Sequence, residues 1–268
     1  MNAKSATAAK ACVPENTNLP IRYWLMAIHL MSVTKKGFSA LEMQRLTGHK
    51  RYEPVWYMLH KIRRIMGKRD AAHQLSGHIE TDEGFFERVD DKGATTTNKQ
   101  KTAPEGDRGN KRGRGSEKQA KVLAMAGSKP SKEGPKKGKP DRKAGYLKMK
   151  AMGDLKASGT NETIKKDVKA GTSAQTDGYR GYNKLKEVLA KHAVIVEPDK
   201  KKAAKLFPWA NRTISNASKV PLCNHHNGIN NNFVQNCLDE FCYKFNRRYF
   251  GDKLFDRLVV AALGTTWY

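Results

Sequence analysis

Two aspartates and one asparagine stand at the ends of short apolar stretches, where their oxygen atoms could hold metal ions. Asp82 follows the stretch 78–81, Asp177 follows 172–176, and Asn216 follows 213–215. The two acids are 95 positions apart, and the asparagine lies 39 positions further on. Such oxygens suit hard divalent cations, and a pair of these cations suits phosphodiester chemistry. The pattern therefore predicts a site, gathered from distant segments, that breaks and forms phosphodiester bonds.

The sequence leaves other assignments of these ligands open. Three glutamates crowd around Asp82, and a single Asp after a strand is often only a turn or cap residue. Asn216 could also be a helix cap, which would leave the third position to an acid elsewhere. The competing acids are Glu80, Glu83 and Glu87 near the first position, and Glu197, Asp199 or Glu240 for the third.

The net charge indicates a polyanionic partner. The chain has 51 Lys or Arg against 26 Asp or Glu, a formal charge of +25 over 268 residues. No apolar run approaches the roughly 18 residues of a membrane span, and residues 1–18 lack a signal-peptide core. The four cysteines form no Cys-x-x-Cys pair, so we expect no zinc site, and the missing export signal predicts a reducing, cytoplasmic compartment.

A basic stretch interrupts the middle of the chain. Residues 91–117 are rich in Gly, Thr, Lys and Arg and almost without large apolar residues, which predicts a flexible insertion. It is either a solvated linker or an arm that neutralises DNA phosphates. Its candidate DNA-binding residues are Lys111, Arg112 and Arg114.

The first 70 residues predict a helix-turn-helix unit. A helix is expected over 20–31, a second from the capping-box pair Ser39 and Glu42 to about residue 47, and a third from Tyr52. The outline fits a plain structural bundle as well, but the charge favours DNA reading. The candidate contacts are Arg51, Tyr57, Lys61 and Arg64.

The remainder predicts an α/β domain. Strands are expected at 78–88, 118–126, 146–152 and 172–176, with a buried strand at 193–196, and helices at 161–168, capped by Thr160, and at 182–192. This is the order of an RNase H-like fold, whose first and fourth strands would bring Asp82 and Asp177 together. A helix over 232–250 would pack its apolar stripe in the core, with Lys244, Arg247 and Arg248 beside it on DNA or in solvent.

Several ordered motifs resemble one known family. Glu-Thr-Asp-Glu at 80–83 and Thr-Asp-Gly-Tyr-Arg-Gly-Tyr at 176–182 are similar to bacterial insertion-sequence transposases of the DDE superfamily. The segments 206–217 and 238–250, with 37–45 and 58–63, resemble the ISXO-like variant in which Asn replaces the third acid. The resemblance covers about residues 19–262. The chain departs from the family at Asn211, where His is usual, and at Lys219, one position later than the family's lysine.

The resemblance implies a fold and an activity. The fold is α/β: an RNase H-like catalytic domain at 76–250, an N-terminal helix-turn-helix region at 19–70 and a C-terminal helix, between a disordered terminus at 1–18 and a tail at 251–268. Asp82, Asp177 and Asn216 would hold two Mg²⁺ or Mn²⁺ ions, and Lys219 would position a phosphate. Such an enzyme cuts element ends and joins them to target double-stranded DNA, as a homodimer or larger assembly.

The same resemblance supplies the main alternative. Family members usually begin with a four-cysteine zinc ribbon, whereas this chain has only Cys12 in that region. A decayed transposase or a helix-turn-helix regulator would bind DNA without cutting it. A simple RNase H-like nuclease is a third possibility, but it would not need the N-terminal reader.

Overall fold

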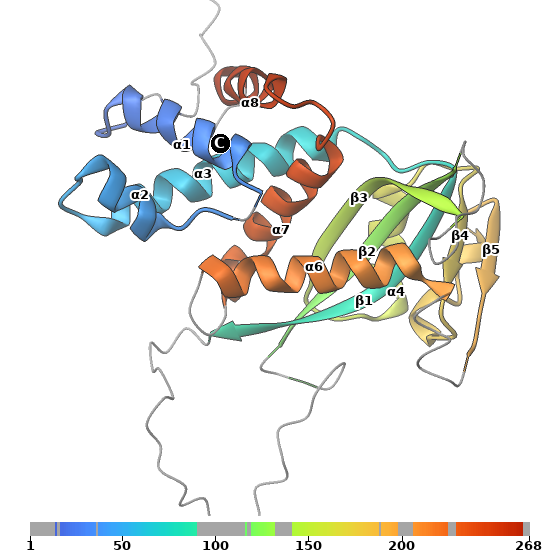
Figure 1. The fold of residues 1–268 in the computed structure, drawn as a ribbon. Helices are drawn as coiled ribbons and strands as arrows, with labels where there is room; N and C mark the ends of the chain where they lie inside the picture. The colour runs from blue at the N-terminus through green and yellow to red at the C-terminus, as the bar shows by residue number, and fades with distance from the viewer. Residues whose placement is uncertain are drawn as a thin grey trace, which may run out of the picture.

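The computed structural model describes residues 14, 17–35, 37–89, 116, 119–131, 141–187, 189–197, 206–224 and 229–264. These residues form a cluster of helices joined to a mixed β-sheet that has helices on both faces (Figure 1). Nearly all of the expected N-terminal segment and of the basic insertion, including Lys111, Arg112 and Arg114, lies outside the described residues.

The three helices predicted for the N-terminal region are confirmed. They are α1 (Ile21–Val33), α2 (Ala40–Thr47) and α3 (Tyr52–Ala71). The capping box begins α2: the backbone N–H of Glu42 donates to Ser39 Oγ (3.1 Å), and that of Ser39 donates to Glu42 Oε2 (2.9 Å). Gly48 ends α2 in the left-handed conformation, with φ at 63°. Helices α2 and α3 therefore follow each other with only a short turn at Gly48 between them.

The segment expected as a C-terminal tail contains a further helix, so that expectation is wrong. Helix α8 (Lys253–Gly264) packs against α1 and α3 and completes their core. Its buried residues Leu254, Leu258, Ala261 and Ala262 recur at helical spacing, and this stripe was the signal for a packed helix.

The sheet places β1 (His78–Val89) at its centre. The strand order is β3-β2-β1-β4-β5, with β2 (Gln119–Pro130) and β3 (Arg142–Met152) antiparallel to their neighbours. Strands β4 (Ser173–Thr176) and β5 (Lys191–Val194) run parallel to β1, and the short β6 (Ile229–Asn230) pairs with its far end. This topology confirms the predicted RNase H-like fold.

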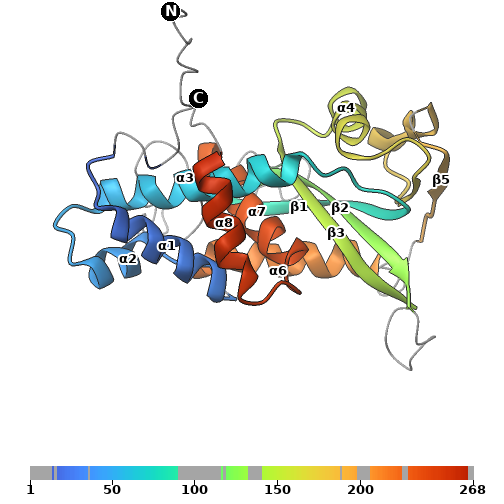
Figure 2. The same cartoon turned by 90° about the horizontal axis from the view of Figure 1, so that it is seen from above.

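Helices cover the two faces of the sheet with separate cores. Helices α6 (Pro208–Asn224) and α7 (Asn231–Asn246) lie on one face and α4 (Ala157–Asp167) on the other (Figure 2). Alternate residues of β2 face opposite sides, as a pleated strand requires: Val122 and Ala124 toward α6 and α7, Leu123 and Met125 toward α4. Such runs of apolar residues identify strands that are buried on both faces.

Three local predictions are wrong. The helix expected over 182–192 is instead a pair of 3₁₀ turns, Arg180–Tyr182 and Leu185–Glu187, which turn buried side chains toward the core beneath α4. Helix α4 begins at Ala157, so Thr160 is a buried residue inside it and not its cap. Strand β5 (Lys191–Val194) lies at the edge of the sheet and is largely exposed, so the expectation of a buried strand over 193–196 is wrong.

Helix α7 joins the two parts of the molecule. Near its centre, Glu240 accepts a 2.7 Å hydrogen bond from Arg63 of α3, and both side chains are only 2% exposed. One residue earlier, Asp239 packs so closely against Gly67 that a Cβ atom there would lie 2.0 Å from its carboxylate. Asp70 and Arg247 form a second ion pair. These contacts fix α3 along α7.

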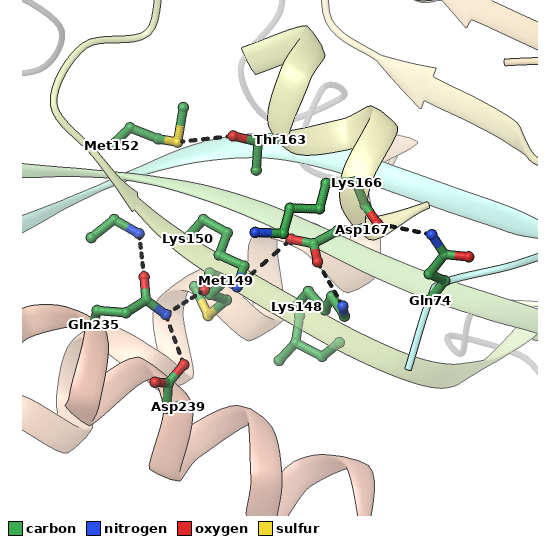
Figure 3. Close-up of polar contacts among 12 residues, drawn as sticks. Gln74, Lys148, Met149, Lys150, Met152, Thr163, Lys166, Asp167, Gln235 and Asp239 are labelled. Carbon is green, nitrogen blue, oxygen red and sulfur yellow. Dashed lines mark hydrogen bonds and ion pairs between the residues drawn. The ribbon is translucent and has the colours of Figure 1, made fainter. Parts of the chain in front are cut away.

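Side-chain amides of α7 cover the outer edge of β3. The backbone N–H of Ala151 donates to Gln235 Oε1 (2.8 Å), and Gln235 Nε2 donates to the carbonyl of Met149 (3.1 Å). Asn246 bonds the N–H and carbonyl of Leu147 in the same manner. Each amide takes the place of a peptide group in a neighbouring strand, and the edge is thereby closed to further pairing. Figure 3 shows the contacts of Gln235.

A buried ion pair holds α4 to the opposite face of β3. Lys148 Nζ donates to Asp167 Oδ1 at 2.7 Å, and Lys150 lies 3.7 Å from the other carboxylate oxygen (Figure 3). The side chains of Lys148 and Asp167 are 6% and 3% exposed. Both lysines therefore serve the packing of the domain.

Candidate active site

Parallel pairing of β1 and β4 brings the two predicted aspartates together. The last paired residues are Thr81 and Thr176, and Asp82 and Asp177 come next on their strands. Adjacent strands lie about 4.8 Å apart, so side chains at the shared carboxyl end converge. One carboxylate oxygen of Asp82 and one of Asp177 lie within 4.8 Å of each other and of an oxygen of Glu83. The predicted convergence is confirmed, and Glu83 joins it.

Consecutive residues of a strand normally point to opposite faces, yet Asp82 and Glu83 reach the same place. Pairing with β4 stops at Thr81, and pairing with β6 begins only at Arg88. Among the described residues, no strand pairs with this edge of β1 between these two points. Side chains from both faces can therefore meet around the open edge.

Backbone hydrogen bonds restrain both aspartates. The N–H of Glu83 donates to Asp82 Oδ1 (2.8 Å), and the N–H of Tyr179 donates to Asp177 Oδ1 (3.1 Å) in an Asx turn. The hydroxyl of Thr176 lies 2.8 Å from His192 Nε2, which ties the end of β4 to β5 beside Asp177. A site restrained in this way needs little reorganisation when it binds a cation.

Glu80 anchors α6 against β1. Its Oε2 accepts hydrogen bonds from the backbone N–H groups of Trp209 (2.8 Å) and Ala210 (3.0 Å), in the first turn of the helix. Burial raises the pKa of Glu80, and these two N–H groups act in the opposite direction. Further along, Gly84 lets α6 approach, because a Cβ there would lie 3.1 Å from Ile214 Cγ2. Glu80 therefore holds the first turn of α6 against β1.

Asn216 and Lys219 lie in the middle of α6, and both are exposed. The possibility that Asn216 is a helix cap is therefore wrong, because the helix begins eight residues earlier at Pro208. Buried Thr213 and Ala217 set the sheet-facing side of α6, and Asn216 stands at its border. The helix that carries Asn216 and Lys219 thus runs beside the strand that carries Asp82.

Most of the other acids that could have been ligands lie outside the acidic cluster. Glu240 is buried between Arg63 and Lys244, so it is no ligand of this site. Glu87 is exposed near the far end of β1, and Asp199 lies outside the described residues. Glu83 is the remaining acid of the first segment, and it lies in the cluster. The sequence shows both Glu80 and Glu83 near Asp82. Only the pairing of the strands shows that Glu83 lies in the cluster and that Glu80 does not.

The predicted DNA-contact residues at the start of α3 and along it lie on an accessible surface. Arg51, Tyr57 and Arg64 are exposed, and Lys61 is partly exposed. The cations at the C-terminal end of α7 contact other parts of the protein, and of these Arg248 is exposed. Lys244 pairs with Glu240, Arg247 pairs with Asp70, and Arg248 donates to the carbonyl of Ala144 at 2.7 Å. Within the described residues, no helix has the length and hydrophobicity to cross a membrane.

The fold is RNase H-like and carries an acidic cluster at the open edge of β1, and the comparisons give its family. The model of the ISXO2-like transposase domain matches residues 74–246, from just before β1 to the end of α7. This match spans more than half of the chain, which therefore belongs to the family of ISXO2-like transposase domains, within the DDE superfamily of insertion-sequence transposases.

Two solved structures are similar over most of the chain. The pre-cleavage Mos1 transpososome is 11% identical with a TM-score of 0.30, covering 95% of this chain and 82% of that one. The Mos1 transposase paired-end complex with the left transposon end is 10% identical with a TM-score of 0.30 and the same coverage. The comparison with curated proteins gives no match.

Proposed function

We propose that this protein is an active DNA transposase, which cuts the ends of an insertion sequence and joins them to target DNA. The observation that carries the proposal is the meeting of Asp82, Glu83 and Asp177 within 4.8 Å at the open edge of β1. The carboxylate oxygens fit Mg²⁺ or Mn²⁺ in chemical type, and they converge from two neighbouring strands. Asp82 and Asp177 would hold the ions, with the neutral amide oxygen of Asn216 as a further ligand.

The side chains then have distinct tasks. Divalent cations at this site would supply Lewis-acid activation of the scissile phosphate. Asp82 and Asp177, restrained by backbone N–H groups, hold the catalytic geometry without reorganisation during the reaction. Water attacks the phosphorus at the element end and leaves a 3′-hydroxyl. That hydroxyl then attacks a target phosphodiester, whose own 3′-oxygen leaves, so no net bond is lost in the joining step. Lys219 would offset charge on the phosphate.

Recognition of the element ends is assigned to α3. The order of helix, short turn and helix and the exposed Arg51, Tyr57 and Arg64 support insertion of α3 into the major groove. Lys61 lies on the same side of the helix. Joining requires two ends in one assembly, so the working form is a dimer or larger on DNA.

Removing a phosphate contact on α3 should weaken DNA binding and its dependence on salt. For Arg51→Ala and Arg64→Ala, we expect the slope of log K against log salt to fall by about one each. Lys165→Ala, at an exposed position on α4, is the matched control and should leave the slope unchanged. Fluorescence anisotropy at several salt concentrations measures it. Unchanged slopes in both arginine variants would remove α3 from the DNA interface.

Cleavage of a labelled duplex tests the proposed activity. The duplex carries the sequences that flank the gene, and the reactions contain Mg²⁺, Mn²⁺ or EDTA. We expect nicks at the 3′ ends of the element with either cation and none with EDTA. Tight binding without nicking under all conditions would instead identify a non-catalytic DNA-binding protein.

A further inference from the structure

Glu83 occupies an unusual place in the acidic cluster. It belongs to the face of β1 that is opposite to Glu80 and to α6, and it is only 9% exposed. Its carboxylate nevertheless comes within 4.8 Å of one oxygen from each aspartate. Three partly buried carboxylates at such distances repel one another, and a divalent cation between them reverses that interaction.

A buried tyrosine is directed at the same cluster. Tyr182 is 1% exposed, and its hydroxyl forms no hydrogen bond of normal geometry with any described residue. Burial raises the pKa of Tyr182 well above its ordinary value, and the charges of Glu83, Asp82 and Asp177 raise it further. A buried donor beside a carboxylate is suited to hold one of its two oxygens.

The local backbone fixes the tyrosine in this position. Tyr182 closes a 3₁₀ turn in which its N–H donates to the carbonyl of Tyr179 at 3.0 Å, and the two rings meet edge to face, 6.0 Å between centroids. The N–H of Tyr179 in turn donates to Asp177 Oδ1. One short turn thus connects the second aspartate to the residue that faces Glu83.

We propose that Glu83 is a third carboxylate ligand of the catalytic metal site and that Tyr182 is its positioning residue, donating its hydroxyl to Glu83. This proposal rests on the proposed function. Two divalent cations bring four positive charges, whereas Asp82 and Asp177 bring two negative charges and Asn216 brings none. Glu83 supplies a third negative charge. It also gives the face of the sheet opposite to α6 a role in holding the ions.

Measuring Mn²⁺ binding in the absence of DNA tests the ligand role of Glu83 separately from the proposed transposase activity. Electron paramagnetic resonance of free Mn²⁺ gives the affinity of the wild type and of each variant. We expect Glu83→Gln to weaken Mn²⁺ binding about 100-fold and Tyr182→Phe about 10-fold, the range typical of groups that bind or orient metal ligands. Glu162→Gln, at an exposed position on α4, should have no effect. Circular dichroism checks the fold, and Glu83→Asp, which keeps the charge but withdraws the oxygens, serves if Glu83→Gln does not fold.

A double variant distinguishes positioning from packing. If Tyr182 acts through Glu83, adding Tyr182→Phe to Glu83→Gln should weaken Mn²⁺ binding no further. Additive losses would overturn the positioning role. Wild-type affinity in both Glu83→Gln and Glu83→Asp, with affinity lost in Asp177→Asn, would overturn the ligand assignment and leave the proposed function intact. Failure of the wild type to bind Mn²⁺ would overturn both.

Discussion

Strand cleavage should fall about 1,000-fold or more when either Asp82 or Asp177 is replaced by Asn. The replacement keeps the size of the side chain but removes the charge that holds a divalent cation. Metal ions contribute several kcal/mol of transition-state stabilisation, and each 1.36 kcal/mol corresponds to a factor of ten in rate. Because the site is separate from the exposed face of α3, DNA affinity should remain within about twofold of the wild type.

The two aspartates should also behave as one unit. A cation that has lost one of these ligands is no longer held in the reactive geometry, so the double variant should be no slower than the slower single variant. Single-turnover nicking of the element-end duplex measures all three variants, with Glu162→Gln as the control. Cleavage that survives in both single variants would show that the catalytic site lies elsewhere.

The second large effect concerns stability, at the ion pair between α3 and α7. Glu240→Ala should lower the free energy of unfolding by about 3–5 kcal/mol, because it leaves the guanidinium of Arg63 buried without its carboxylate. Urea unfolding measures the loss. Glu162→Ala, which removes an exposed carboxylate from α4, should change the stability by less than about 0.5 kcal/mol. A loss below about 1 kcal/mol in Glu240→Ala would mean that the ion pair adds nothing to the interface.

The same ion pair predicts a dependence of stability on pH. Burial alone would raise the pKa of Glu240, but the charges of Lys244 and Arg63 outweigh it and lower the pKa to about 2. A carboxylate with a depressed pKa stabilises the fold above its unfolded pKa, and this contribution is lost as pH falls from about 4.5 to about 2. The contribution of Asp239 to the pH dependence of stability has the opposite sign, since burial raises its pKa to about 6. The difference between wild type and Glu240→Gln isolates the effect: it should be constant above pH 5 and shrink below.

The sequence predicted those features that depend on repeated local patterns. The capping pair Ser39 and Glu42 was sufficient for a helix and the apolar run of β2 for a strand, and the order of the predicted elements indicated the RNase H-like topology. Convergence of Asp82 and Asp177 followed from that topology, because residues at the same end of parallel neighbours must meet.

Features that depend on tertiary contacts could not be predicted. Glu80 and Glu83 are three positions apart in one motif, yet one caps α6 and the other joins the acidic cluster, because pairing with β4 ends at Thr81. Lys244 and Arg247 have the composition of a DNA-binding face, but their acidic partners are supplied by α7 itself and by α3. No periodicity in the chain encodes such pairings.

The close packing of α3 against α7 has a consequence for where the protein would cut the DNA. Gly67, Arg63 and Asp70 attach α3 to the helix that also closes the edge of the catalytic sheet. If α3 reads the element end, its separation from the acids is set by the protein and not by a flexible linker. The packing of α3 against α7 would then fix the number of base pairs between the sequence that the protein binds and the bond that it cuts.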